Sequence, residues 1–527
     1  MTRARTVYIT TPIYYVNAVP HLGTFYSTVV ADALARYHRA RGRETYFLTG
    51  TDEHGQKIQQ MARQAGKTEK AFCDDIAARF QETWRRAGIT HDRFIRTTDP
   101  DHEASVRDMW RRLADAGHLR LGEYDGLYCT GCEDWKIDDE LEAGEGGARL
   151  CRIHRTPVDR VREPNFYFRL SDFQQPLLRL YERQPNFIRP ESRRNEVVEF
   201  VKGGLRDLSV SRTSVKWGIP VPDAPGHTIY VWIDALTNYV SALGGPSAVQ
   251  EGGTKAALWK SAHHLIAKDI LRFHAVYWPA MLMAAGLPLP AGVFCHGYLT
   301  VKGQKISKSI PATRVDPDAI AVELGVDPLR YFVLREYTLG ADGDFTYESL
   351  FGRYEADLGN DLGNLLNRTV SMAWKYVGGT VPPAAAARSA SELADLAARK
   401  RSEVESHWES FSPSRALEAT WEIVRAANGY IDRRAPWKLA KDPAAADELA
   451  RVLGDCCEAL RWAARMVAPA MPERSREILR QLGRPGDADG WPEAFAWPGA
   501  QLAAAIPVFP RIDPERRAAL IARWMPA

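Results

Sequence analysis

Residues 6–49 read TVYITTPIYYVNAVPHLGTFYSTVVADALARYHRARGRETYFLT, and this stretch decides the fold. Its first part, Thr6 to Tyr15, is rich in β-branched and aromatic residues, which predicts a buried strand. Apolar residues then recur at every fourth position from Phe25 to Tyr37, which predicts a helix that ends near Arg41-Gly42. Thr45 to Thr49 predicts a second strand. Strand, helix and strand form a βαβ unit, so we expect a parallel sheet that binds ligands at the carboxyl ends of its strands.

The composition of the remaining sequence changes twice along the chain. Residues 117–222 are rich in turns and glycines and contain a cysteine cluster, so we interpret them as an inserted domain. Apolar strands are expected again at Thr228 to Ile233 and near Val293 to Phe294, where they should complete the sheet. From about Tyr347 the pattern is nearly all helical, and the Pro- and Ala-rich segment Val381 to Ala387 interrupts it as a surface connection.

Composition sets outer limits on the interpretation. A chain of 527 residues is too long for one core, and 45% hydrophobic with 26% charged residues describes an ordinary globular protein. The net charge of +3 is compatible with a nucleic-acid partner but does not argue for one. Prolines and glycine interrupt the uncharged stretch Ala275 to Phe294, which favours a short buried helix and a turn over a membrane span. We find no signal peptide and expect a cytoplasmic protein.

Two short stretches have the chemistry of phosphate binding. His21 and Gly23 lie where the first strand gives way to the helix, and a helix N-terminus favours anions. By itself this pattern is a weak signal and favours a helix cap with a surface histidine. Lys302 to Ser309, KGQKISKS, places three lysines and two hydroxyls in one loop, where they could neutralise a triphosphate. A solvated basic loop is the alternative, and the order and separation of the two stretches argue against it.

A third pattern has metal-ligand spacing. The sequence contains a CxxC…CxxH pair made of Cys129, Cys132, Cys151 and His154. Three thiolates and an imidazole give closed tetrahedral zinc coordination, with no open position for a catalytic water. We therefore predict one structural zinc ion, because a small, turn-rich insertion lacks the apolar area to stabilise itself. Two unrelated pairs of buried cysteines are the alternative.

The phosphate stretches resemble the HIGH and KMSKS motifs of class I aminoacyl-tRNA synthetases. Along nearly its whole length the chain resembles the bacterial type of methionyl-tRNA synthetase. The resemblance implies an α/β fold: a Rossmann-type parallel-sheet catalytic domain with an inserted zinc-knuckle connective domain, followed by an all-α anticodon-binding helical bundle. It implies five parts: the first half of the catalytic domain (1–116), the connective domain (117–222), the second catalytic half (223–296), a KMSKS-loop junction domain (297–350) and the helical domain (351–527).

The implied reaction has two steps: ATP converts methionine to its adenylate, and the methionyl group then passes to the terminal ribose of a tRNA. ATP, with Mg²⁺, would be bound by residues matching the family motifs: His21, Gly23, Thr24, Ala267, Asp269, Lys305, Ser307 and Lys308. The implied catalytic residues are His21, Arg212, Lys305 and Lys308. The alternative to a catalytic role for Arg212 is a surface salt bridge. Thr24, Ala267 and Ile306 replace the family's histidine, glycine and methionine.

By the same resemblance, a pocket for methionine is formed by Ile13, Tyr15, Asp52, Trp232, Ala235, Leu236, Tyr239 and His274. Asp52 would hold the substrate ammonium group, although it could equally cap the following helix. Aromatic rings suit a thioether, and without the family match most of them would be interpreted as core.

Recognition of the CAU anticodon is implied for Asn364, Arg368 and Trp437. Unstacked RNA bases are recognised by hydrogen bonds to their edges and by stacking on aromatic faces, which suits these residue types. The alternatives are a solvated helix face for Asn364 and Arg368 and a packing anchor for Trp437. The expected partners are ATP, L-methionine and tRNA(Met), and we expect a monomer that binds no membrane.

Three other functions stay open at this stage. Thr24 and Ala267 both fall on the nucleotide side, as in a diverged duplicate with an altered nucleotide site or altered inhibitor sensitivity. A tRNA-binding protein without catalysis would not need Asp52, Lys305 and Lys308. An enzyme that passes the adenylate to another acceptor would not need the anticodon residues.

Overall fold

The computed structural model describes residues 6–131, 134–136, 138–144, 147–153, 155–306, 315–383 and 391–525. By their internal contacts these residues form two compact units. The first unit comprises residues 1–20, 45–85 and 91–296, and the second comprises residues 21–44, 86–90 and 297–527. The five-part division predicted above is a finer one and stays a prediction. In the described parts of the chain, no helix is long and apolar enough to cross a membrane.

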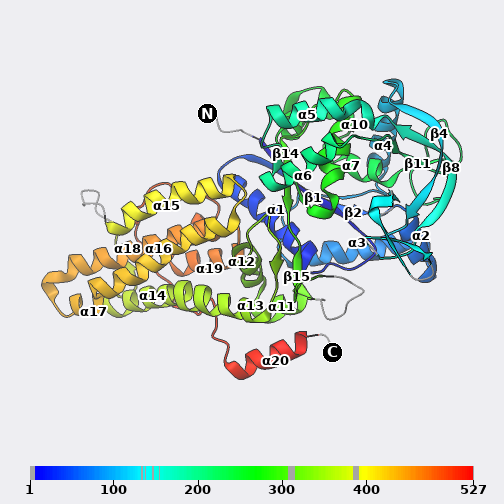
Figure 1. The fold of residues 1–527 in the computed structure, drawn as a ribbon. Coiled ribbons are helices and arrows are strands. Elements are labelled where there is room, and N and C mark those ends of the chain that lie inside the picture. The colour runs from blue at the N-terminus through cyan, green and yellow to red at the C-terminus, as the bar shows by residue number, and fades with distance from the viewer. Residues whose placement is uncertain are drawn as a thin grey trace. The chain divides into compact units, whose positions relative to one another are not determined.

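A six-stranded sheet forms the centre of the first unit, in the order β3-β2-β1-β13-β14-β9. The pairs β2–β3, β1–β13, β13–β14 and β14–β9 are parallel, as the βαβ pattern predicted. Strands β1, β2 and β14 are labelled in Figure 1. The six strands are β1 (Thr6–Tyr15), β2 (Glu44–Asp52), β3 (Arg93–Arg96), β9 (Ile188–Arg189), β13 (Ala262–Ala267) and β14 (Gly292–His296).

One predicted strand of this sheet is wrong. Of Thr228 to Ile233, only β12 (Thr228–Ile229) forms a strand, and it pairs with β11 (Ser211–Arg212) outside the central sheet. Val231 already begins helix α7 (Val231–Ser241), which is buried along its whole length. Here a helix that is buried on all sides begins with a continuous apolar run, and such a run does not distinguish it from a buried strand. The sheet instead uses β13, together with the predicted strand β14.

The segment predicted as an insertion supplies a second, antiparallel sheet of order β10-β8-β4-β5. Its long ladder joins β4 (Leu119–Cys129) to β8 (Asp159–Phe168), flanked by β5 (Asp134–Lys136) and β10 (Leu208–Ser209). Strands β6 (Leu141–Ala143) and β7 (Arg149–Cys151) pair in a separate small hairpin. The same segment contains β9, which pairs with β14 at the edge of the central sheet, so residues 117–222 also contribute a strand to that sheet.

Helices complete the first unit. Those that matter for the site are α4 and α7, which pack against each other, and the π-helix η5 beside α7. The helices are α2 (Gln56–Gln64), α3 (Glu69–Arg86), α4 (Pro100–Asp115), α5 (Gln174–Arg183), α6 (Glu191–Lys202), α8 (Pro246–Gln250), α9 (Gly253–Lys260), η5 (Phe273–Tyr277) and α10 (Trp278–Ala284).

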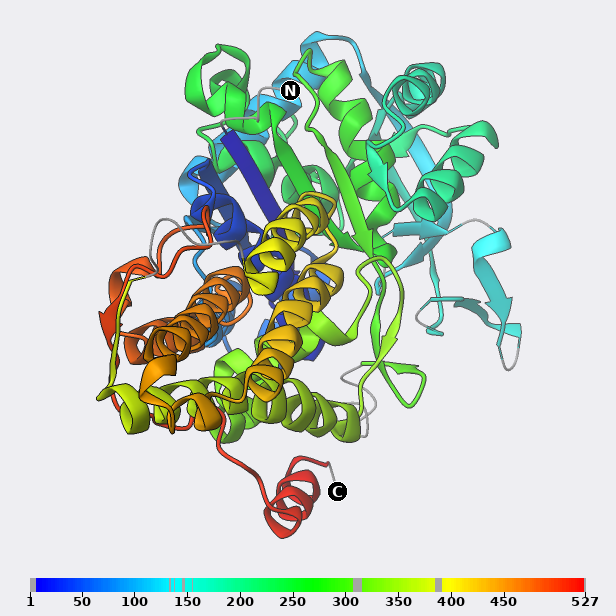
Figure 2. The same ribbon diagram turned by 90° about the vertical axis from the view of Figure 1, so that its left-hand side faces the viewer.

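The second unit is mainly helical, as predicted from residue 347 onward. Its long helices α15, α16 and α18 pack against one another and appear in yellow and orange in Figure 2. Small strand pairs interrupt the pattern: β15 (Leu299–Val301) with β16 (Gln304–Lys305) and β17 (Gly343–Asp344), and β18 (Thr380–Val381) with β19 (Ala500–Gln501). The helices are α1 (Leu22–Ala40), α11 (Pro317–Leu324), α12 (Val326–Glu336), α13 (Tyr347–Arg353), η7 (Tyr354–Gly363), α14 (Asn364–Val377), α15 (Glu392–Glu409), α16 (Pro413–Arg434), α17 (Pro436–Leu439), α18 (Ala446–Val467), α19 (Pro472–Gln481) and α20 (Pro514–Trp524).

A buried ion pair fixes α1 within this unit. The Arg330 guanidinium of α12 donates to the Asp32 carboxylate of α1 at 2.6 Å, and both side chains are fully buried. Arg330 also donates to the carbonyl oxygens of Pro469 and Ala470 at 3.0 Å, so the guanidinium joins three parts of the unit. Burial opposes the charge on Asp32, but Arg330 and Arg36 outweigh it and lower the pKa of Asp32 to about 2.

Replacing this arginine should cost much of the unit's stability. Arg330→Met should lower the free energy of unfolding by about 3–5 kcal/mol, because it leaves a buried carboxylate without its main cation. The measurement is urea unfolding followed by circular dichroism at pH 7. Arg433→Met is the matched control, because Arg433 pairs with Glu392 at the surface, where both side chains are more than half exposed. Its expected cost is below about 1 kcal/mol. Equal costs for the two variants would contradict the role of the Asp32–Arg330 pair.

Candidate active site

Three of the predicted site residues lie at neighbouring strand ends of the first unit. Tyr15 and Asp52 end β1 and β2, and Ala267 ends β13. The backbone N–H of Val16 donates to the Asp52 carbonyl at 3.2 Å, which holds the first two strand ends together. The chain order of the sheet reverses between β1 and β13, and ligands of parallel sheets bind at such switch points. This edge is therefore the candidate active site.

Helix α7 presents the predicted pocket residues on one face. Trp232, Ala235, Leu236 and Tyr239 follow the spacing i, i+3, i+4 and i+7, and all are buried. Ile13 of β1 packs against the same buried cluster. The sheet and this helix thus bring together residues that lie far apart in the sequence, as the family resemblance implied.

His274 joins this face through a hydrogen bond. Its Nε2 lies 2.7 Å from the Tyr239 hydroxyl, and its Nδ1 lies 2.9 Å from the Ile270 carbonyl oxygen. Because a carbonyl only accepts, Nδ1 carries the proton and Nε2 accepts from tyrosine. Burial lowers the pKa of His274 to about 4, so the ring is neutral at physiological pH. This end of the pocket is therefore aromatic, polar and uncharged.

Sequence reasoning missed Phe273, the residue before His274. Its ring stacks on Trp232 with centroids 3.6 Å apart and planes 9° from parallel. Phe273 begins the π-helix η5, an irregularity that is frequent at functional sites. The only signal in the sequence was an aromatic residue beside a predicted site histidine, which does not distinguish a pocket wall from core.

A buried charge network behind α7 was also missed. The Asp234 carboxylate accepts from His54 Nδ1 at 2.6 Å and from His102 Nε2 at 2.7 Å, and all three side chains are at least 95% buried. Burial opposes a charge on His54, but Asp234 outweighs it and raises the pKa of His54. Likewise, burial acts to raise the pKa of Asp234, and the two histidines hold it below its usual value. The network ties the end of β2, which supplies Asp52, to α4 and α7.

The first phosphate stretch forms a helix cap in the second unit. His21 is the N-cap of α1, and its Nδ1 accepts from the Gly23 N–H at 3.1 Å. Thr24 completes a capping box, because its hydroxyl accepts from the His21 N–H at 3.0 Å. A Cβ at position 23 would lie 3.0 Å from the His21 ring, so the site favours glycine. The cap gives Thr24 a structural role that the sequence had not explained.

Other predicted residues are placed as follows. Arg212 is buried in β11, with its guanidinium over the rings of Tyr230 and Tyr128 at 4.4 and 5.4 Å, so it is no surface salt bridge. Asp269 lies in a short turn after Ala267.

Ser307 and Lys308 lie outside the described residues, as do Cys132 and His154, and only the backbone of Lys305 is described. Cys129 and Cys151 end β4 and β7, and both are buried.

The three predicted anticodon residues lie in the second unit. Asn364 begins α14 and is exposed, and Arg368 follows one turn later. Arg368 donates to Asp432 near the end of α16 at 2.5 Å, and α17, which contains Trp437, begins four residues after Asp432. Trp437 exposes 38% of its surface, unlike a tryptophan that anchors a core. The Arg368–Asp432 contact joins α14 to the end of α16, and α17 follows that end directly.

The parallel sheet with its switch point, the capped helix after β1 and the aromatic face of α7 are the features expected of a class I tRNA synthetase, and the comparisons with known proteins show this class. The sequence profile described as "tRNA synthetases class I (M)" matches residues 7–151 and 137–370. The chain belongs to the methionyl-tRNA synthetase family, as two groups of relatives show.

Among curated proteins, the chain is 44% identical to a methionine–tRNA ligase of Caldanaerobacter subterraneus over 98% of this chain and 80% of that protein. It is 42% identical to that of Streptomyces coelicolor over 97% of both chains. Among solved structures, the methionyl-tRNA synthetase of Mycobacterium tuberculosis in complex with methionyl-adenylate is 41% identical, with a TM-score of 0.90 over 96% of this chain and all of that one. The family named from the motifs is thereby confirmed.

The Asp234 network predicts a pH-dependent stability. Asp234→Asn should lower the free energy of unfolding by about 3 kcal/mol at pH 6, because it breaks a buried charge pair. The raised pKa of His54 stabilises the fold below the unfolded histidine pKa of about 6.5, and this contribution is lost as the pH rises through the folded value. The difference between variant and wild type should therefore shrink from pH 6 to pH 9 in urea titrations. Asp172→Asn, at an exposed carboxylate, should show no such difference. A constant difference across this range would argue against the ion pair.

Proposed function

We propose that the chain activates L-methionine with ATP and transfers it to the 3′-terminal ribose of a tRNA with a CAU anticodon. The observation that carries the proposal is the uncharged aromatic cluster of Trp232 and Tyr239 on α7 with His274, because the Asp234–His54 hydrogen bond ties this helix to the strand end that contains Asp52. The names of the relatives give the same substrate, since those proteins are methionine–tRNA ligases.

The chemistry of the pocket suits this amino acid. A thioether makes favourable contacts with aromatic rings, and a neutral His274 adds no charge that would favour an acidic side chain. Asp52 is 2% exposed, and a buried carboxylate binds an ammonium group through charge-assisted hydrogen bonds. The pocket would thus hold the side chain at α7 and the α-amino group at β2, which leaves the methionine carboxylate as the reacting group.

Activation joins that carboxylate to the α-phosphorus of ATP and releases pyrophosphate. The 3′-terminal ribose hydroxyl then attacks the carbonyl carbon of the adenylate, and AMP leaves. No protein nucleophile is needed, so catalysis rests on position and electrostatics. We assign phosphate contacts to His21, Gly23 and Thr24 at the start of α1 and to Lys305, Ser307 and Lys308, with Arg212 near the reacting atoms and Ala267 and Asp269 at the nucleotide sugar. Mg²⁺ would accompany the ATP phosphates.

For the insertion we propose one zinc ion, held by Cys129, Cys132, Cys151 and His154. The two ligands that the structure describes fit this role, because both thiols are fully buried at strand ends, Cys129 at the end of β4 and Cys151 at the end of β7. The hairpin that ends at Cys151 has strands of only three residues, too short to supply much apolar burial of its own. Zinc coordination would supply the missing stability.

For the helical unit we propose anticodon binding by Asn364, Arg368 and Trp437. The exposed ring of Trp437 can stack on an unpaired base, while Asn364 and Arg368 offer hydrogen bonds to base edges. A monomeric state and a cytoplasmic location remain predictions from the sequence.

The function is tested by comparing its two half-reactions. The protein should catalyse methionine-dependent ATP–pyrophosphate exchange and should charge a CAU-anticodon tRNA. Trp437→Ala should lower the charging efficiency by about 10- to 100-fold, because one base–aromatic stack is lost, and should leave exchange within about twofold of wild type.

Trp374→Ala is the matched control. Trp374 is also exposed, and it lies ten residues beyond Asn364 on the same helix α14. It should leave both half-reactions unchanged. Absence of exchange at saturating methionine and ATP would refute activation and would favour the diverged duplicate or a protein that only binds tRNA. Exchange without charging by the wild type would indicate another acceptor. Equal losses of exchange and charging in Trp437→Ala would show that this ring is structural.

Metal analysis tests the zinc site. Purified protein should contain about one zinc ion per chain, and Cys129→Ser should lose it and unfold at a lower temperature. Cys456→Ser is the control, since Cys456 is equally buried but lies in α18 of the other unit, and this variant should keep its zinc. A zinc content near zero in the wild type would refute the knuckle.

A further inference from the structure

Two acidic residues follow each other at the end of β2, and the proposed reaction uses only the first of them. Asp52 is the proposed ligand of the substrate ammonium group, whereas no step involves Glu53, whose side chain is fully buried. A buried carboxylate is strongly destabilising unless cations or hydrogen-bond donors compensate it. The partners of Glu53 therefore indicate what this second carboxylate does.

Four donors occupy the Glu53 carboxylate. Arg96, at the end of β3, donates from Nε to Oε1 at 2.6 Å and from Nη2 to Oε2 at 2.9 Å. The Thr51 hydroxyl donates to Oε1 at 2.8 Å, and the Thr98 hydroxyl donates to Oε2 at 2.6 Å. Each oxygen thus accepts two hydrogen bonds, which uses both of its lone pairs. A substrate ammonium group would have to displace one of these donors, so Glu53 is unsuited to bind it and this role stays with Asp52.

The backbone around Glu53 is fixed as well. Its N–H donates to the Thr97 hydroxyl at 2.9 Å, and its carbonyl oxygen accepts from the Trp217 indole N–H at 2.5 Å. The carbonyl oxygen of Asp52 accepts from the Val16 N–H at 3.2 Å. The peptide group that joins Asp52 to Glu53 is therefore held at its oxygen and at its nitrogen. Because this peptide group is shared, a displacement of Glu53 would displace Asp52 with it.

We propose that the Glu53–Arg96 ion pair positions Asp52 and thereby sets the preference of the amino-acid site for ligands with an α-ammonium group. The pair ties the end of β2 to the end of β3, where Thr51 and Arg96 are register partners. It also neutralises the Arg96 guanidinium, which would otherwise compete with the substrate cation for the negative charge of Asp52. The inference rests on the proposed function, because it assigns a role to the neighbour of the ammonium ligand.

The test compares two ligands that differ only in the ammonium group: L-methionine and 4-(methylsulfanyl)butanoate, which is methionine without its α-amino group. Titration calorimetry measures both affinities without catalysis, with the weaker ligand in competition. Glu53→Gln keeps the shape of the side chain and removes its charge. It should lower the preference for methionine, expressed as the ratio of the two dissociation constants, about tenfold, because the charge-assisted hydrogen bonds to the ammonium group weaken. The affinity for the analogue and the KM for ATP in exchange should both stay within about twofold of wild type.

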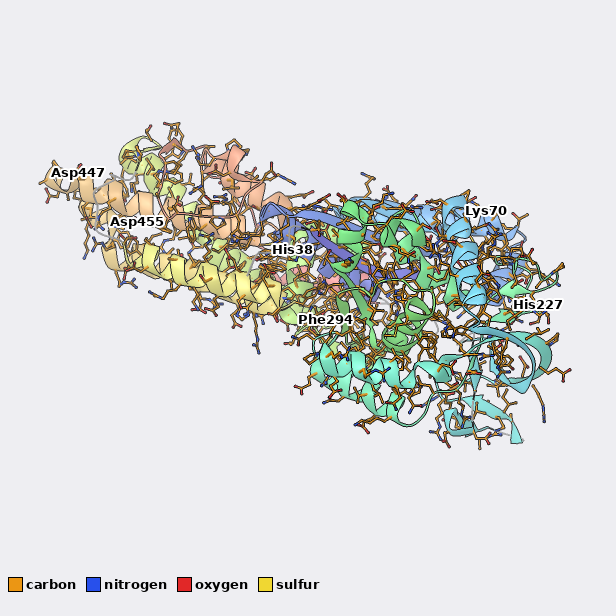
Figure 3. All side chains as sticks on the ribbon, turned by 90° about the horizontal axis from the view of Figure 1, so that it is seen from above. His38, Lys70, His227, Phe294, Asp447 and Asp455 are labelled. Carbon is orange, nitrogen blue, oxygen red and sulfur yellow. The ribbon has the colours of Figure 1, made fainter. Side chains whose placement is uncertain are left out.

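Arg96→Lys covers the case in which Glu53→Gln does not fold. It keeps the positive charge but cannot bind both carboxylate oxygens as a planar fork, so it should lower the preference about threefold. Asp74→Asn is the matched control. Asp74 of α3 also pairs with Arg96, at 2.6 Å, and with Lys70, labelled in Figure 3, but its side chain is about half exposed and it lies on a different element from Asp52. This variant should keep the full preference for methionine.

The inference is overturned if Glu53→Gln weakens the binding of both ligands equally, because the ion pair would then be structural only. It is also overturned if Asp74→Asn loses the preference to the same extent, or if the wild type binds both ligands with equal affinity. Binding of methionine without exchange in the wild type would instead refute the proposed function, and the ratio of the two dissociation constants would still decide the role of Glu53.

Discussion

The charge on Asp234 is the constraint on which the candidate active site depends. A carboxylate that is 98% buried is strongly destabilising unless cations or N–H donors compensate it, and here two imidazoles do so from two other elements. One comes from the end of β2, two residues after Asp52, and the other from α4. Because the two carboxylate oxygens fix both histidines, the strand end that contains Asp52 and helix α7 keep one relative position.

The second unit also contains a buried carboxylate that a cation compensates, and here the ion pair fixes a helix. Arg330 and Asp32 are both fully buried, and the guanidinium also satisfies the backbone carbonyls of Pro469 and Ala470. Helix α1, whose N-terminus has the capping box of His21 and Thr24, is thereby fixed to the helices of its own unit. Thr24, where the family resemblance implied a histidine, completes this helix cap.

Much of the fold followed from local patterns. The strand Thr6–Tyr15, the helix with apolar residues four apart and the mainly helical part from about Tyr347 onward were predicted correctly, because their sequence patterns are strong. The segment Thr228–Ile233 failed because a helix buried on all sides has the composition of a buried strand. The strand β9 was missed because two residues are too few for any pattern.

The sequence by itself determined the family, the residue types predicted for the methionine pocket and the metal-ligand spacing, because the order of motifs and the helical periodicity are properties of the linear sequence. Only the tertiary structure decided that His274 is neutral and paired with Tyr239, that Phe273 stacks on Trp232, and that Asp234 holds two histidines. Each of these contacts joins residues of different elements, and protonation depends on burial and on charges within a few ångströms. Neither quantity has a local signature in the sequence.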